Sequence, residues 1–97
     1  DNAMTLNVIG YLFNVGELVI TRGAWDELTN DEVWHNLVRH MSGDWGKVCE
    51  FEWEQNGLAL DHGGRLLSSY STRSGTVFWI ITEHDRSVTT ILLPAEY

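Results

Sequence analysis

Basic residues are scarce in this sequence. Six lysines and arginines stand against fourteen aspartates and glutamates, which gives a formal net charge of −8. Such a charge repels polyanions at long range and argues against a protein that coats DNA or RNA. We therefore expect a protein partner rather than nucleic acid, although a local basic site stays open as an alternative.

Cysteine and long apolar runs are nearly absent as well. The single cysteine, Cys49, has no partner for an intramolecular disulfide, which fits a reducing compartment or indifference to redox state, with Cys49 as a small apolar residue. No apolar run approaches the ~18–20 residues that cross a bilayer, and no basic segment followed by an apolar stretch marks a signal peptide. We expect a cytoplasmic protein with no membrane partner.

Motifs for metals and nucleotides are missing too. The four histidines, His35, His40, His62 and His84, are not spaced as zinc ligands, and the lone cysteine adds no second ligand type. Neither a GxxxxGK[ST] phosphate loop nor a GxGxxG motif occurs. The sequence predicts no metal and no cofactor.

What the sequence does contain is enough apolar material for one core. Its 97 residues are 43% hydrophobic and include five tryptophans, so packing is expected to provide stability without disulfides. Asp1-Asn2-Ala3 resembles an expression-vector remnant ahead of Met4. We therefore predict a single domain over residues 4–97.

The acidic residues are unevenly distributed. Only Arg39 and Lys47 oppose the eight that fall between positions 26 and 54, which are Asp26, Glu27, Asp31, Glu32, Asp44, Glu50, Glu52 and Glu54. We interpret them as a solvated helical face. The alternative is a functional acidic patch that mimics nucleic acid, which would require these carboxylates to form one row on the surface.

The first half of the chain predicts a hairpin and then helices. Thr5–Phe13 and Leu18–Thr21 are β-prone runs separated by turn residues. Ala24–Leu28 reads as one helical turn. Thr29-Asn30-Asp31-Glu32 then forms a capping box, which predicts a helix from about Asn30 that ends near Gly43.

The second half predicts one more helix and three strands. Apolar spacing favours a helix over Glu50–Leu60, and Gly63-Gly64 ends it. Alternation and β-branched residues predict strands at 66–71, 76–82 and 88–93, joined by short polar turns. The fold class is therefore α+β, with two helices packed on one face of an antiparallel sheet that ends in a three-stranded meander.

Two polar loops are candidates for binding. Asp44 and Trp45 lie in a glycine-flanked loop, and Glu83, Asp85 and Arg86 lie in a turn between two strands. Exposed aromatic and charged side chains suit a recognition patch. The alternative is structural: Trp45 fills the core, and the polar residues stabilise their own turns. Exposure of Trp45 would favour binding, and full burial would make its loop structural.

From Leu18 onward the chain resembles a family of short uncharacterised proteins carried on bacterial plasmids and other mobile elements. The residues that carry the resemblance are Arg39-His40, Ser42-Gly43-Asp44-Trp45-Gly46, Gly64-Arg65-Leu66-Leu67-Ser68, Tyr70, Trp79-Ile80-Ile81-Thr82-Glu83, Asp85-Arg86-Ser87, Thr89-Thr90, Leu92-Leu93-Pro94 and Glu96-Tyr97. The resemblance implies a mobile-gene origin, on a plasmid or gene cassette, and a bacterial cytoplasm. It implies no particular reaction.

A second resemblance is to the barnase group of microbial ribonucleases. Arg65-Leu66-Leu67 and Thr82-Glu83-His84 are similar to the strand arginine and late hairpin histidine of that group. The resemblance implies that Glu52, or a neighbouring glutamate, takes the 2′-OH proton. Arg65 would stabilise the phosphorane and His84 would protonate the leaving oxygen. This function requires the three side chains to converge in one cleft.

Three functions therefore stay open. The first is a small non-catalytic binding or accessory protein of a mobile element, with a protein partner held by the two polar loops. The second is the ribonuclease with Glu52, Arg65 and His84 as its catalytic residues. The third is a structural homodimer, which the aromatic-rich sheet suggests.

Overall fold

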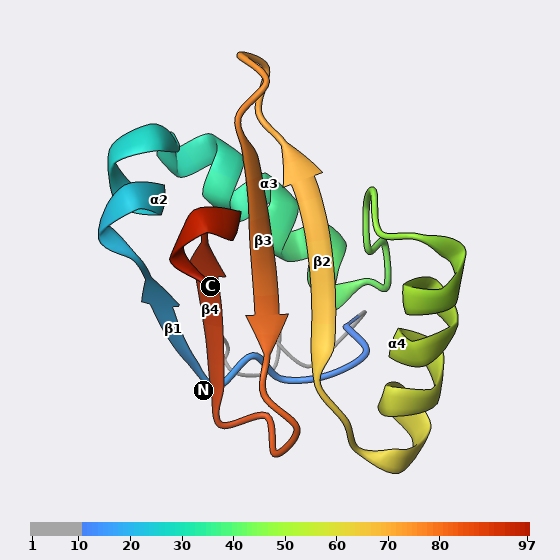
Figure 1. Cartoon of the computed structure of the whole chain (residues 1–97). Helices are drawn as coiled ribbons and strands as arrows, with labels where there is room; N and C mark the ends of the chain where they lie inside the picture. Colours follow the sequence, from blue (N-terminus) through green and yellow to red (C-terminus); the bar gives the residue numbers. More distant parts are fainter. Residues whose placement is uncertain (1–10) are drawn as a thin grey trace.

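A computed structural model describes residues 11–97 of the chain. These residues form four strands and three helices joined by loops, followed by a final 3-10 turn (Figure 1). In chain order the elements are β1 (Glu17–Ile20), α2 (Arg22–Glu27), α3 (Asn30–Met41), α4 (Glu50–His62), β2 (Leu66–Ser71), β3 (Val77–Thr82), β4 (Val88–Leu92) and η1 (Pro94–Glu96). The predicted α+β class is confirmed. None of the helices within residues 11–97 has the length and apolar character needed to span a bilayer.

The four strands form one sheet in the order β1-β4-β3-β2. Antiparallel pairing of β2 with β3 and of β3 with β4 gives the predicted C-terminal meander. β1 differs from the prediction, because it runs parallel to β4 with Glu17 opposite Val88, so the sheet is mixed.

The predicted N-terminal hairpin is only partly within the structure. Residues 5–10 of its first strand lie outside the described residues, and residues 11–13 form no strand. The backbone N–H of Glu17 donates to Ser87 O at 3.0 Å, and that of Thr21 donates to Ile91 O at 3.0 Å. These bonds fix the parallel register of β1 on β4.

The α3 helix begins where its capping box predicts. Thr29 Oγ1 accepts from the Glu32 N–H at 3.1 Å, and Glu32 Oε1 accepts from the Thr29 N–H at 2.9 Å. These two bonds satisfy N–H groups that lack a partner within the helix. The last turn carries Arg39, whose positive charge interacts favourably with the negative end of the helix dipole.

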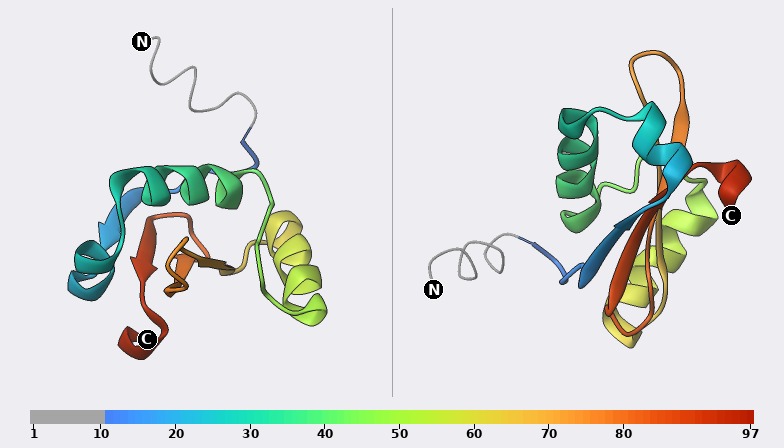
Figure 2. Two further views of the ribbon diagram at one scale, coloured as in Figure 1. Left: turned by 90° about the horizontal axis from the view of Figure 1, so that it is seen from above. Right: turned by 90° about the vertical axis from the view of Figure 1, so that its left-hand side faces the viewer.

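One face of the sheet, called the inner face here, lies under α3 (Figure 2). Its strands contribute Tyr70, Phe78, Ile80 and Ile91, all almost fully buried. Val33 and Leu37 of α3 belong to the same cluster. Because side chains alternate along a strand, the neighbouring residues face the other side, called the outer face.

The α4 helix lies along the β2 edge of the sheet, beyond the inner face that α3 covers (Figures 1 and 2). Two contacts explain this position. Ala59 is buried in a second apolar cluster with Trp45 and Leu66, and Asn56 bonds to the β2 backbone. The two predicted helices therefore do not share one face, because α4 is joined to the edge of the sheet by a polar side chain.

Candidate functional site

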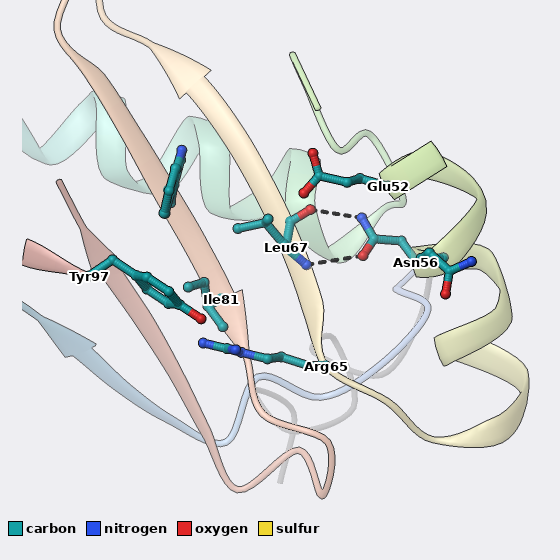
Figure 3. A pocket seen from close by; sticks show the side chains of 8 residues that line it. Glu52, Asn56, Arg65, Leu67, Ile81 and Tyr97 are labelled. Carbon is teal, nitrogen blue, oxygen red and sulfur yellow. Dashed lines mark hydrogen bonds between the residues drawn. The ribbon is translucent and has the colours of Figure 1, made fainter. Parts of the chain in front are cut away.

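A groove opens on the outer face of the sheet, between α4 and the end of the chain (Figure 3). Its volume is about 360 Å³, at the low end of the roughly 300–1,000 Å³ of ligand sites. Its lining is apolar at the strands and polar at the sides, and consists of Glu52, Gln55, Asn56, Arg65, Leu67, Trp79, Ile81 and Tyr97.

Asn56 forms the α4 wall of the groove and fixes the helix to the sheet. Its Nδ2 donates to Leu67 O at 2.8 Å, and its Oδ1 accepts from the Leu67 N–H at 3.1 Å (Figure 3). The amide thus pairs with β2 as a neighbouring strand would. Since buried backbone groups must be hydrogen-bonded, this contact holds α4 at a set distance from Leu67.

Arg65 and Tyr97 form the opposite wall. The guanidinium carbon of Arg65 lies 5.1 Å from the centre of the Tyr97 ring, within the range of a cation–π contact. Arg65 Nε also lies 3.9 Å from Glu83 Oε2, and the Arg65 side chain is 47% exposed. A pair this long and exposed contributes little energy, so the guanidinium is free to form stronger hydrogen bonds with a ligand.

Tyr97 is positioned by the residue before it. Glu96 Oε1 accepts from Thr21 Oγ1 at 2.5 Å and from the Leu93 N–H at 2.9 Å, while Oε2 accepts from the Gly23 N–H at 3.0 Å. The hydrogen bond from Thr21 is the main cause that holds the pKa of Glu96 below its usual value. These bonds join η1 to the start of α2.

The Tyr97 ring also packs edge-on against Trp79, with 5.6 Å between the ring centres. Trp79 is half-buried on the outer face of β3, while the Tyr97 side is open to solvent. Edge-to-face aromatic pairs at this separation are favourable. The groove therefore presents two aromatic rings that are packed against each other and still accessible.

The predicted binding loop around Trp45 is structural. Trp45 is only 2% exposed and packs against the rings of Phe13 and His40. Asp44 accepts from Arg39 Nε at 2.8 Å and from the Gly46 N–H at 3.2 Å. The bond from Arg39 lowers the pKa of Asp44. Both predicted residues thus serve the loop itself.

In the predicted binding turn at residues 83–86, Arg86 and Asp85 already form hydrogen bonds within the protein. Arg86 donates to the carbonyls of Ala59, Gly64 and Glu83. It therefore joins the end of α4 to the β3–β4 turn.

The two acids of that turn have different surroundings. Asp85 accepts from the hydroxyl and the N–H of Ser87, and the hydroxyl bond lowers the pKa of Asp85. Glu83, through its pair with Arg65, is the predicted binding residue that lies nearest the groove.

The predicted ribonuclease residues separate into two places. Glu52 and Arg65 both line the groove, on opposite sides of it, whereas His84 is not among the residues that line it. His84 is exposed in the β3–β4 turn. The proposed base and the arginine that would stabilise the phosphorane thus line one groove, without the proposed acid.

A buried polar chain runs under α3. His40 is fully buried, and its Nδ1 lies 2.5 Å from Ser68 Oγ and its Nε2 2.9 Å from Thr82 Oγ1. Thr82 and Thr89 hydroxyls are 2.7 Å apart, and Thr89 donates to Val15 O at 2.7 Å. All five groups belong to different segments, so the chain joins α3 to three strands and to the loop before β1.

The last bond of this chain, from the Thr89 hydroxyl to Val15 O, determines the donor and acceptor in each of the other bonds. Because Thr89 donates its only hydroxyl hydrogen to Val15, it must accept from Thr82, and Thr82 must then accept from His40 Nε2. His40 therefore carries a hydrogen on Nε2, and in the neutral ring Nδ1 accepts from Ser68. Burial is the main cause that lowers the pKa of His40 to about 3.

The sequence analysis missed most of the groove. Asn56, Leu67, Trp79, Ile81 and Tyr97 were not singled out, since their types are common in a core or on a helix. Four of these residues gave a partial signal, because they fall within the segments that carry the mobile-element resemblance; they are Leu67, Trp79, Ile81 and Tyr97.

Metal ligands are not clustered in the part of the chain that the structure describes. Across residues 11–97 no three histidine, cysteine, aspartate or glutamate side chains are placed to hold one ion. Comparisons of the chain with protein-family models, with curated proteins and with solved structures gave no match.

Proposed function

We propose that this chain is a small non-catalytic accessory protein of a bacterial mobile element, a plasmid or gene cassette, which binds a protein partner in the cytoplasm. The mobile-element origin rests on the resemblance described above. The binding site in this proposal is the groove between α4 and Tyr97, and it replaces the two loops that the sequence suggested.

The observation that carries the proposal is the pair of accessible aromatic rings beside a half-exposed arginine. Tyrosine, tryptophan and arginine are the residues most enriched where protein partners bind tightly. Tyr97 is 67% exposed, yet its position is held by the Glu96 hydrogen bonds. A site that is ordered before binding loses less entropy when a partner arrives.

The composition of the groove favours binding over catalysis. Its apolar floor suits one large apolar side chain of a partner, and Glu52 and Arg65 offer charges of opposite sign at its sides. The ribonuclease alternative needs an imidazole acid in the same place, and His84 belongs to a separate turn. Binding therefore uses the groove's residues as they are arranged.

The test is a selection of displayed random peptides on the immobilised protein, followed by affinity measurements on the selected peptides in solution. We expect Tyr97→Ala and Trp79→Ala each to weaken binding at least tenfold. Trp34→Ala is the matched control, because Trp34 is 60% exposed on α3 and does not line the groove. Peptides that bind all the variants equally would overturn the proposal.

The same protein should also be incubated with single-stranded RNA beside a His84→Ala variant. We expect the RNA to stay intact with both proteins. Cleavage that is lost in the variant would make His84 a catalytic residue and replace the binding function with the ribonuclease. Light scattering gives the molar mass and tests the homodimer alternative in the same samples.

A further inference from the structure

The exposed side of α4 carries apolar side chains that nothing in residues 11–97 covers. Phe51 is 66% exposed and Leu58 is 53% exposed. Gln55 lies between them on the same stripe of the helix, four residues after Phe51 and three before Leu58. Since Gln55 also lines the groove, the stripe and the groove form one continuous surface.

Acidic residues flank this stripe. Between residues 50 and 62 the helix carries Glu50, Glu52, Glu54 and Asp61 and no lysine or arginine. Glu54 is a surface neighbour of both apolar residues, three positions after Phe51 and four before Leu58. An apolar stripe bordered by carboxylates is complementary to an apolar stripe bordered by lysines and arginines.

The edge of β2 is already paired, so an added strand has no place beside it. Asn56 occupies the backbone groups of Leu67. The backbone of Trp45 accepts from Ser69 at 3.0 Å, and that of Lys47 donates to Ser69 at 2.8 Å. A partner at this surface must therefore bring its own satisfied backbone, as a helix does.

We propose that the α4 stripe and the groove together bind a basic amphipathic helix of the partner protein. The proposal rests on the proposed function, because both use the groove. The partner's apolar side chains, spaced i, i+3 or i+4 and i+7, contact Phe51, Leu58 and the rings of the groove. Its lysines or arginines lie against Glu54 and Glu52, and the net charge of −8 attracts it.

Three synthetic helical peptides with a fluorescent label test this inference by anisotropy with the full chain. The first has leucines at helical spacing flanked by lysines. The second replaces each lysine by glutamate. The third keeps the lysines and replaces each leucine by alanine. We expect the first to bind at least tenfold more tightly than either of the others.

Variants of the protein locate the binding surface. A Phe51→Ala/Leu58→Ala double variant should bind the first peptide at least tenfold more weakly. Glu54→Gln should bind it several-fold more weakly, and the salt dependence of that binding should be smaller. Trp25→Ala on α2, which removes a side chain 64% exposed, is the control. Equal binding of all three peptides, no binding of the first, or indifference to the double variant would overturn the inference.

Failure here is distinguishable from failure of the proposed function. Displayed peptides that depend on Tyr97 but not on Phe51 or Leu58, and that carry no basic flank, would keep the groove as a binding site and end the basic-helix inference. If binding depends neither on the groove rings nor on Phe51 and Leu58, both the proposed function and the basic-helix inference are wrong.

Discussion

The two faces of the sheet differ in what they bury: the inner face buries a chain of hydrogen-bonded polar groups, and the outer face leaves two aromatic rings accessible. On the inner face, under α3, Ser68, His40, Thr82 and Thr89 are fully buried and hydrogen-bonded to one another. On the outer face, polar side chains surround a groove with rings open to solvent. No buried side-chain nitrogen or oxygen in residues 11–97 lacks a partner.

The difference separates stability from recognition. A buried polar chain with every bond formed ties several segments into one arrangement, because any shift leaves a buried group unpaired. The outer face keeps its apolar rings accessible, which costs stability and provides binding surface. The inner face thus acts as the rigid support on which the groove is presented.

The largest expected effect of a single substitution lies on the inner side. Trp45→Ala should lower the free energy of unfolding by about 3–5 kcal/mol, because it removes a ring that is 2% exposed and packed against two others. Urea denaturation measures this. Trp34→Ala, at 60% exposure, should change it by less than about 0.5 kcal/mol. Similar losses from both tryptophans would show that burial does not set the cost, which would contradict the structural role of Trp45.

The second effect is a pH dependence of stability. The His40 pKa is about 3 in the folded state and about 6.5 when unfolded, so the unfolded chain binds more protons between these values. Stability should therefore fall as the pH drops through this window, by at most about 1.4 kcal/mol per pH unit.

Urea titrations between pH 6.5 and 4.5 measure this slope. We expect the free energy of unfolding to fall by about 2–3 kcal/mol over that range. Asp44, Asp85 and Glu96 have lowered pKa values, so their contribution is lost at lower pH. His40→Gln removes the titrating group, and its stability should vary less over the same range. An unchanged slope in that variant would assign the pH dependence to other residues.

The smallest of the three effects concerns the support of the groove. Asn56→Ala leaves the N–H and C=O of Leu67 without their partners and should cost about 1–3 kcal/mol. It should also weaken groove binding, because α4 loses its fixed distance from β2. Gln55→Ala, an exposed neighbour that lines the same groove, is the control for stability. A loss no greater than that of Gln55→Ala would show that other contacts hold α4.

Local sequence signals predicted the elements well and their arrangement less well. The capping box at Thr29 and the alternation of residues 66–71 depend on neighbours in the chain, and both were confirmed. The parallel pairing of β1 joins Glu17 to Val88, and no local pattern encodes a contact over that distance. The composition shows that the protein is acidic, but it does not show that acidic residues flank the exposed apolar stripe on α4.

Candidate site residues were harder to predict for a related reason. Arg86, Asp44 and Trp45 have residue types typical of binding sites, but in the structure they stabilise loops. The groove depends on which face of β3 carries Trp79 and on where η1 places Tyr97. Both follow from tertiary packing, which the spacing of residues along the chain does not specify.

The parallel pairing of β1 with β4 has a consequence for synthesis of the chain. β4 lies between β1 and β3 and is the last of these four strands to leave the ribosome. Until Val88–Leu92 emerges, β1 lacks the strand with which it pairs in residues 11–97, and β3 lacks one of its two neighbours. Contacts that span most of a chain form slowly. We therefore expect the nascent protein to stay open, and a target for chaperones, until translation has passed β4.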